Sequence, residues 1–270
     1  MNTAGLKKYG TLLRMGMIES LQFRLSTVVM VVGNLIYLTI IYFLWKAIYA
    51  SSGTPVVNGL TFNDTLIYLV LATALFGFME MYTVWEIGRN IQSGKIVLDL
   101  LKPMDYRNYL FWSYTGGLVM NFLCVFVPTF IVVCIVTGGA VPLGANLPFF
   151  ALSVVFGVII NYSVDFIVGT ICLFTESIWG INIMKQMVVM LLSGATIPIA
   201  FFPEPMKTVV YYLPFQAIYN TPLLILLNGT PSLDVTGRLL GLQIMWCIVM
   251  TVISVLFWRV SLRQITVNGG

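Results

Sequence analysis

The sequence predicts an all-α membrane protein with six transmembrane helices in one domain, residues 1–270, and three observations support this fold class. Hydrophobic residues make up 59% of the chain and charged residues only 9%, whereas a soluble domain is about 25% charged. The apolar residues form runs of the length that a bilayer requires, about 20 residues for each helix. The Lys and Arg residues are concentrated on one side of these runs, as the positive-inside rule describes.

Six apolar stretches are long enough to cross the membrane. They lie at 26–46, 65–84, 109–137, 147–174, 179–202 and 239–258. The third and fourth are long enough to cross at a tilt, and we expect Pro128 to kink the third. An even number of crossings places both termini on the same side.

The charge distribution predicts that both termini are cytoplasmic. In that orientation only Lys46, Lys207 and Arg238 of the 14 basic residues lie outside. Cytoplasmic loops carry the excess of Lys and Arg in membrane proteins. The cytoplasmic set would be Lys7, Lys8, Arg14, Arg24, Arg89, Lys95, Lys102, Arg107, Lys185, Arg259 and Arg263.

Residues 5–24 precede the first apolar stretch and have an amphipathic pattern. Leucine and methionine side chains can share one helical face, and basic side chains supply the other. This pattern is typical of a helix that lies in the membrane interface. The alternative is a disordered basic tail.

A polar segment, residues 85–107, separates the second and third apolar stretches. It reads WEIGRNIQSGKIVLDLLKPMDYR and carries four basic residues, so we expect it to face the cytoplasm. Its apolar residues recur at helical spacing, and Gly94 and Pro103 interrupt it. A compact amphipathic helix that does not span the membrane indicates docking to a soluble partner.

The segment 203–238 is apolar but cannot be one regular spanning helix. Pro203, Pro205, Pro214 and Pro222 interrupt it. Irregular backbone is tolerated at membrane depth only where protein or a water-filled cavity covers it. We therefore predict two short helices that enter the outer leaflet and return. An ordinary extracellular loop is the alternative.

Several classes of chemistry are excluded or disfavoured. The chain has no histidine, and its four cysteines lie in apolar runs without a CxxC pair, so no metal site is predicted. Its formal charge of +4 does not suggest nucleic-acid binding. The Gly94–Lys95 pair is not a P-loop, because Arg89 replaces the first glycine and Ile96 the Ser or Thr. If ATP drives this protein, a separate polypeptide binds it.

Two acidic residues, Glu80 and Asp165, lie within predicted spans at similar depth in the inner part of the bilayer. An intramembrane carboxylate is a functional candidate because it is costly there. One interpretation is a proton or cation site. The other, which we favour, is an internal ion pair with Arg24, Arg89 or Lys185.

Small and polar residues within the spans are expected to serve helix packing. Gly116–Gly117 and Gly194 would allow close approach of helices, although no second small residue stands at the usual spacing. Asn161, Ser163, Ser193 and Thr196 are expected to form interhelical hydrogen bonds rather than to catalyse a reaction.

The order of these features resembles the ABC-2 type permeases, the membrane subunits of ABC exporters. Four segments carry the resemblance, and together they cover nearly the whole chain. The similar segments are the helix before the first span, EIGRNIQSGKIVLDLLKP (86–103), SGATIPIAFFPEPMK (193–207) and YYLPFQAIYNTP (211–222). The pattern is most similar to bacterial six-span permeases encoded beside a second permease and an ATPase.

The resemblance implies a multi-pass subunit of the bacterial cytoplasmic membrane. Two permeases, identical or related, would surround a central path, and a separate ATPase dimer would bind ATP and Mg²⁺. This chain would bind no cofactor and would not be an enzyme. Residues 88–101 would form a coupling helix seated in the ATPase, with an apolar plug and a polar rim. The partner contacts would be Ile87, Gly88, Arg89, Ile91, Gln92, Gly94, Lys95 and Leu98.

The resemblance also implies an outer gate formed by the segment before the last span. The gate residues would be Pro198, Phe202, Pro203, Pro205, Tyr211 and Pro214. Many members of the wider superfamily carry a large extracellular domain, which this chain lacks. Export of small or amphipathic substrates therefore fits better than transfer to a large periplasmic partner.

Two other functions are compatible with some of these features. An ion-coupled secondary transporter would use Glu80 or Asp165 and would need no docking helix. A membrane scaffold or sensor would not couple to an ATPase.

Overall fold

The computed structural model is almost entirely helical and describes residues 3–22, 24–137, 141–142, 144–175, 178–228 and 233–264. The first half contains α1 (Thr3–Gln22), α2 (Arg24–Ser52), β1 (Val56–Val57), β2 (Leu60–Thr61), α3 (Phe62–Met79), α4 (Thr83–Gln92), α5 (Ile96–Leu100) and α6 (Tyr106–Asn121). The second half contains a π-helical turn (Phe122–Phe126), α7 (Val127–Val136), α8 (Asn146–Ile171), α9 (Ile178–Leu192), a 3-10 turn (Ile199–Phe201), α10 (Glu204–Tyr212), α11 (Gln216–Leu227), α12 (Leu233–Ser261) and a final 3-10 turn (Leu262–Gln264).

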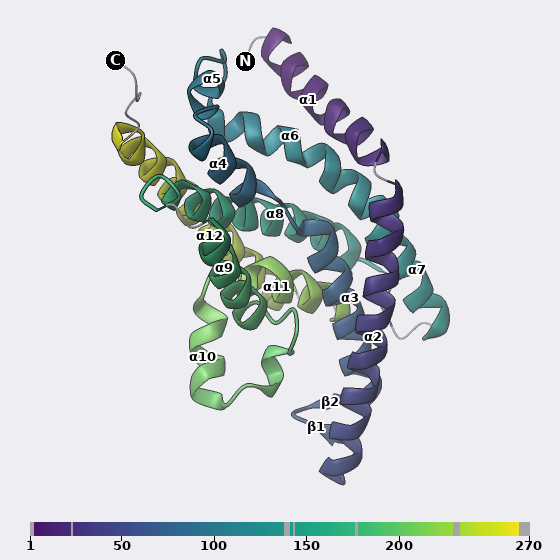
Figure 1. Cartoon of the computed structure of the whole chain (residues 1–270). Coiled ribbons are helices and arrows are strands. Elements are labelled where there is room, and N and C mark those ends of the chain that lie inside the picture. Colours follow the sequence, from purple (N-terminus) through teal and green to yellow (C-terminus); the bar gives the residue numbers. More distant parts are fainter. Residues whose placement is uncertain are drawn as a thin grey trace.

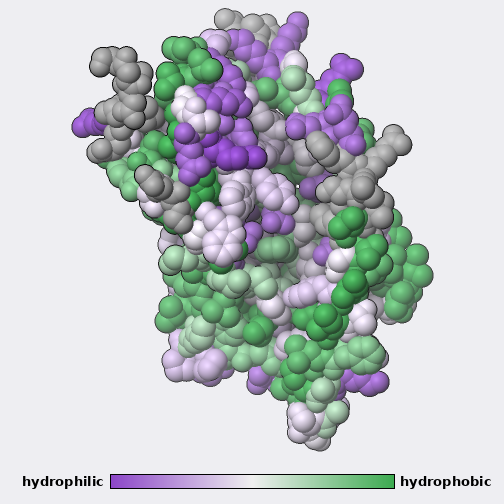
Figure 2. All heavy atoms as spheres, viewed as in Figure 1, coloured by the Kyte–Doolittle hydropathy of each residue, from purple (hydrophilic) through white to green (hydrophobic). Residues whose placement is uncertain are grey.

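The molecule has a hydrophilic end and a broad hydrophobic region. Figure 1 places α5, the start of α1 and the end of α12 at one end, and the β1–β2 hairpin and α10 at the other. Hydrophilic side chains gather at the α5 end, and hydrophobic side chains dominate the surface beyond it (Figure 2). Both described chain ends thus lie at the hydrophilic end.

Five helical segments are long and apolar enough to cross a bilayer, which makes the chain a multi-pass membrane protein. They are Val32–Ser52, Phe62–Gln92, Tyr106–Val136, Asn146–Ile171 and Asp234–Ser261. They match five of the six predicted stretches. A bent pair, α10 with α11, supplies a sixth if it is counted as one span, and its helices meet at 99°.

The predicted continuous helix over 179–202 was wrong. The helix there, α9, has 15 residues, or roughly 22 Å of rise, which is shorter than the bilayer core of about 30 Å. The chain leaves the helix at Gly194, whose φ is 78°, and Pro198 removes a further backbone donor. Residues 193–198 therefore form a turn rather than the last turns of a span.

Two other spans are irregular. The second is interrupted between α3 and α4, where Glu80 adopts an extended conformation (φ −64°, ψ 121°). The third contains the π-helical turn directly before Pro128, which occupies the first turn of α7. Such a turn is a recognised cause of helix bending, so the irregularity predicted at Pro128 lies just before that residue.

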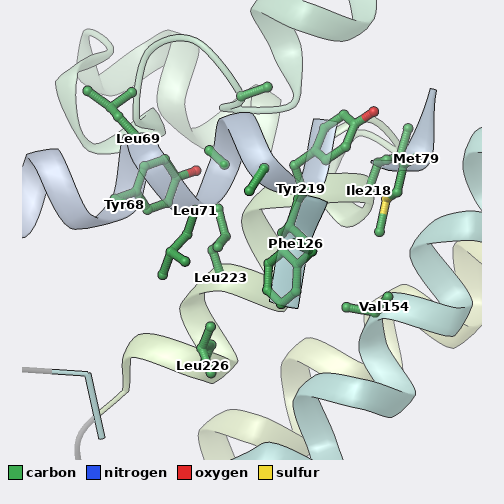
Figure 3. Packing of buried hydrophobic residues seen from close by; sticks show 14 of the residues in the cluster. Tyr68, Leu69, Leu71, Met79, Phe126, Val154, Ile218, Tyr219, Leu223 and Leu226 are labelled. Carbon is green, nitrogen blue, oxygen red and sulfur yellow. The ribbon is translucent and has the colours of Figure 1, made fainter. Parts of the chain in front are cut away.

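The core lies where α3, α8 and α11 meet. Leu71, Leu75 and Met79 of α3 are fully buried and belong to the same cluster as Ile218 and Leu223 of α11. Figure 3 shows Leu71, Met79, Ile218 and Leu223 in this cluster, together with Tyr219 and Phe126. Because α11 is buried over most of its length, it is an interior element and not a surface loop.

Close backbone contact and a buried amide hold α11 in place. A Cβ atom at Gly157 of α8 would lie 2.8 Å from the Ile218 carbonyl oxygen, so α8 approaches α11 at a position that requires glycine. Gln243 of α12 donates to the Ala217 carbonyl (2.8 Å) and the Ser153 carbonyl (2.9 Å). One side chain thus links α8, α11 and α12.

Helix α1 packs along α6 through glycines. A Cβ atom at Gly116 would lie 2.6 Å from the Met17 backbone nitrogen and would also overlap the Leu13 carbonyl oxygen. A Cβ atom at Gly16 would lie 2.5 Å from the Ser113 carbonyl oxygen. The partner of Gly116 is thus a small residue on another helix, which the spacing of glycines within one helix cannot reveal. The helix over residues 3–22 also rules out a disordered tail.

We expect Gly116→Ala to destabilise the protein by about 1–3 kcal/mol, because overpacking of a close contact has that cost. Thermal unfolding in detergent, together with proteolysis within α1, measures the effect. Gly10→Ala on the partner helix α1 is the matched control, because nothing lies within 4 Å of a Cβ atom at Gly10. Equal stability of the two variants would contradict the close α1–α6 packing.

Candidate functional site

The last part of the second span, α4, and the segment that follows it form two short helices joined by a sharp turn, which we call the elbow (residues 83–102). Helix α4 ends at Gln92, and Gly94 follows with φ 71° before α5 begins at Ile96. A positive φ favours glycine because other residues clash there. The coupling helix predicted over 88–101 is thus divided into two helices, with the break at Gly94 that the sequence indicated.

Two of the predicted partner contacts are buried inside this chain. Ile87 has no exposed surface, and a Cβ atom at Gly169 of α8 would lie 2.7 Å from its Cδ1 atom. A Cβ atom at Gly88 would lie 2.7 Å from Ile178 of α9. These contacts correct the expected role of Ile87 and Gly88, which fix α4 to α8 and α9. Ile91 is partly buried against the same region.

The predicted polar rim lies on the exposed side of the elbow. Arg89 and Lys95 approach the Glu86 carboxylate at 3.3 Å and 3.8 Å. Both cations are exposed, and such surface pairs contribute little to stability. Together with Gln92 and Ser93, these side chains line a shallow depression.

Residues 96–101, which we call the tip of the elbow, expose large apolar side chains. Leu98 is 66% exposed and Leu101 is 76% exposed, and both lie outside the five spanning segments. Their i, i+3 spacing places them on one side of the chain. Leu98 was predicted as a contact, whereas Leu101 was missed, although the same spacing indicates it.

A buried polar chain joins the two helices of the elbow to α6. Asp99 accepts hydrogen bonds from Asn90 Nδ2 (3.0 Å) and from Lys102 Nζ (2.8 Å). The Lys102 ammonium lies 3.8 Å from the centre of the Tyr109 ring. Burial alone would lower the pKa of Lys102, but its hydrogen bonds to Asp99 and Tyr109 raise that pKa above the usual value. Lys102 is therefore a cation at neutral pH.

The interruption of the second span is covered by a side chain of α8. Asn161 Nδ2 donates to the Met79 carbonyl oxygen at 2.9 Å. That carbonyl lies at the end of α3 and has no following helical turn to accept from. The predicted interhelical hydrogen bond of Asn161 is confirmed, and Glu80 lies at a break rather than within a regular helix.

The two intramembrane carboxylates meet side chains of α9. Asp165 Oδ1 lies 2.9 Å from Lys185 Nζ, and Gln186 Nε2 donates to Glu80 Oε1 at 3.4 Å. Lys185 is one of the three cations that the sequence suggested as an internal partner. Arg89 instead pairs with Glu86, and the side chain of Arg24 lies outside the described part.

A cavity of about 460 Å³ adjoins the break. It lies among α1, the α3–α4 junction and α6. Its lining residues include Glu19, Glu80, Tyr82, Tyr109 and Tyr114.

The predicted gate residues lie in α10 and in the turns on either side of it. Pro203 precedes α10, Pro205 lies in its first turn, and Pro214 lies in the bend before α11. Phe202 is buried in a small cluster, against which Tyr211 packs. Pro198 precedes the 3-10 turn. These residues therefore shape two short helices, while residues 229–232 of the predicted segment lie outside the described part.

Tyr68 of α3 holds the turn at Gly194 and helix α11 against the core. Its hydroxyl lies 3.0 Å from the Gly194 carbonyl oxygen and 3.1 Å from Asn220 Oδ1. Tyr68 thus connects the end of α9 to α11.

We expect Lys185→Met to destabilise the protein by about 3–5 kcal/mol, because it leaves the buried Asp165 carboxylate without a counter-charge. The double variant Lys185→Met/Asp165→Asn should recover most of this loss. Thermal unfolding of wild type, the two single variants and the double variant in detergent gives a double-mutant cycle that measures the interaction of the two side chains. Additive losses would show that the two side chains do not interact.

Comparison with known proteins identifies the family. The family model described as ABC-2 family transporter protein matches residues 35–269. No curated protein matches the chain. The matched range begins within α2 and includes the elbow, the α10–α11 pair and α12. The chain therefore belongs to the ABC-2 transporter family of multi-pass membrane proteins.

Proposed function

We propose that this chain is the membrane-spanning permease subunit of an ATP-driven exporter. The observation that carries the proposal is the exposed apolar pair Leu98 and Leu101, which lies on the elbow beyond the end of the second span. Exposed apolar side chains with a polar rim are typical of a surface that another protein covers. Membership of the ABC-2 family indicates an ATP-binding subunit as that protein.

The partner would be a dimer of ATP-binding subunits that holds ATP and Mg²⁺. Leu98 and Leu101 would fill its apolar groove, and Arg89, Gln92 and Lys95 would contact the edge. This chain would supply neither a catalytic residue nor a cofactor site. In this proposal the elbow lies in the bacterial cytoplasm together with both termini, which the basic residues of the hydrophilic end support.

A second permease, identical or related, would complete the central path. ATP-driven closure of the ATPase dimer would displace the elbow in each permease. Because Ile87 packs against Gly169 and Gly88 packs against Ile178, the displacement would reach α8 and α9 directly. The α10–α11 pair would open and close the outer end of the path for small or amphipathic substrates.

The ion-coupled alternative receives no support from the carboxylates. Asp165 is already paired with Lys185, and Glu80 accepts from Gln186. Both contacts hold α9 in place, which accounts for the polar groups without an ion.

We expect Leu98→Asp and Leu101→Asp to abolish capture of the ATP-binding subunit. A charge at either position would have to be buried in the apolar groove, at a cost of several kcal/mol. Tagged wild-type chain and each variant are purified from detergent membranes, and co-purifying proteins are identified by mass spectrometry and ATPase assay. Ile91→Asp is less suitable, because Ile91 packs within the chain.

Val56→Asp is the matched control, because Val56 is an exposed apolar residue in the hairpin at the opposite end. It should retain the ATPase. If both leucine variants capture an ATPase at the wild-type level, the tip of the elbow is not the docking surface. Absence of any ATPase from the wild-type sample would refute the exporter proposal itself.

A further inference from the structure

We propose that Asp99 is a positioning residue that fixes the docking tip to two spanning segments at once. This inference rests on the proposed function. The tip is joined to α4 through Asn90 and to α6 through Lys102 and Tyr109, with Asp99 as the common partner. A displacement of Leu98 and its neighbours would therefore reach the second and third spans together.

Helix α5 cannot hold its own orientation. It has five residues, and isolated helices shorter than about 12 residues are marginal in water. Only Ile96 and Asp99 of this helix are buried. Its orientation therefore depends on the packing of Ile96, beside which Val97 is partly buried, and on the hydrogen bonds of one carboxylate.

The Asp99 carboxylate is almost completely buried, with 4% of the residue exposed. A buried charge is costly unless it is paired and hydrogen-bonded, and both oxygens of Asp99 have a partner. Oδ2 accepts from Asn90 Nδ2 at 3.0 Å, and Oδ1 accepts from Lys102 Nζ at 2.8 Å. One bond comes from α4 and the other from the residue that leads from α5 toward α6, so the carboxylate links α5 to the segments on both sides of it.

Asn90 is suited to this position because its amide is neutral and carries two hydrogens. Asn90 Nδ2 also donates to Glu86 Oε1 at 3.2 Å. The amide thus separates two carboxylates, one on α4 and one on α5, while it bonds to both. An acidic residue at this position would bring three carboxylates together.

The start of α6, which Lys102 contacts through Tyr109, is itself held in place by other parts of the protein. Asp105 caps α6 by accepting from the Asn108 backbone nitrogen. The next residue, Tyr106, stacks on Trp258 of α12 with ring centres 5.1 Å apart. Lys102 is joined to α6 through Tyr109. The start of α6 is therefore a fixed point against which Lys102 holds the tip.

The first test needs no partner. We expect Asp99→Asn to accelerate backbone hydrogen exchange in residues 96–101 by about tenfold, because α5 then opens locally more often. The full chain is measured in nanodiscs. Asp234→Asn is the matched control, because Asp234 forms an equivalent ion pair with Arg238 that is exposed. Lys102→Met is a second variant that removes the charge pair but keeps the Asn90–Asp99 bond.

The second test measures transmission in the complex with the ATP-binding subunit. Exchange is compared before and after addition of ATP and vanadate. In the wild-type complex we expect changes in both α4 and the first turn of α6. In Asp99→Asn and Lys102→Met the change in α6 should be lost while the ATPase still co-purifies, a separation that general misfolding would not produce.

The outcomes separate the two proposals. Unchanged exchange of residues 96–101 in both variants, or an α6 response equal to that of wild type, overturns the role of Asp99. Accelerated exchange in a chain whose wild type captures no ATPase supports Asp99 as the residue that positions α5 and refutes the exporter proposal. Loss of ATPase capture in Asp99→Asn but not in Asp234→Asn also overturns the proposed role, because transmission through Asp99 requires docking to be retained.

Discussion

The requirement that each backbone polar group be satisfied within the protein governs this structure. Lipid offers no hydrogen-bond partners, so an interrupted helix is possible only where other parts of the protein or a water-filled cavity cover the exposed carbonyl. Asn161 does so at the end of α3 and Tyr68 does so at Gly194. Each of these side chains comes from a different helix. The irregular elements of the protein therefore exist because neighbouring spans supply their missing partners.

These interruptions produce the parts of the molecule that bear on function. The break after Met79 lets α4 leave the direction of α3 and pack against α8 and α9. The turn at Gly94 then exposes the α5 tip, and the turn at Gly194 leads into the bent α10–α11 pair. Helix α9 contacts α4 at its start, through Ile178, and leads into α10 at its end. We propose that both α4 and α10 move. Helix α8 connects α4 with the α10–α11 pair, because it contributes both to the core cluster that holds α11 and to the cluster that holds α4.

Much of the architecture was predictable because it depends on local composition. An apolar run of about 20 residues has few alternatives to a spanning helix, and five of the predicted spans are helices in the structure. The failed prediction, 179–202, combined a helix with an apolar turn. Hydropathy cannot distinguish these, because residues covered by protein at membrane depth are apolar in either conformation. The candidate site was predicted in outline, as a segment, but not residue by residue.

The sequence by itself determined that this is a multi-pass helical protein, where its spans lie, and which segment between them is polar. These properties follow from transfer energies summed over consecutive residues. Only the tertiary structure decided that Ile87 faces inward while Leu98 and Leu101 face outward, and that Asp99 meets Lys102 and Asn90 in a buried site. Likewise, the pairing of Asp165 with Lys185 joins residues from different helices. Such contacts depend on how helices pack, which the periodicity of one segment does not contain.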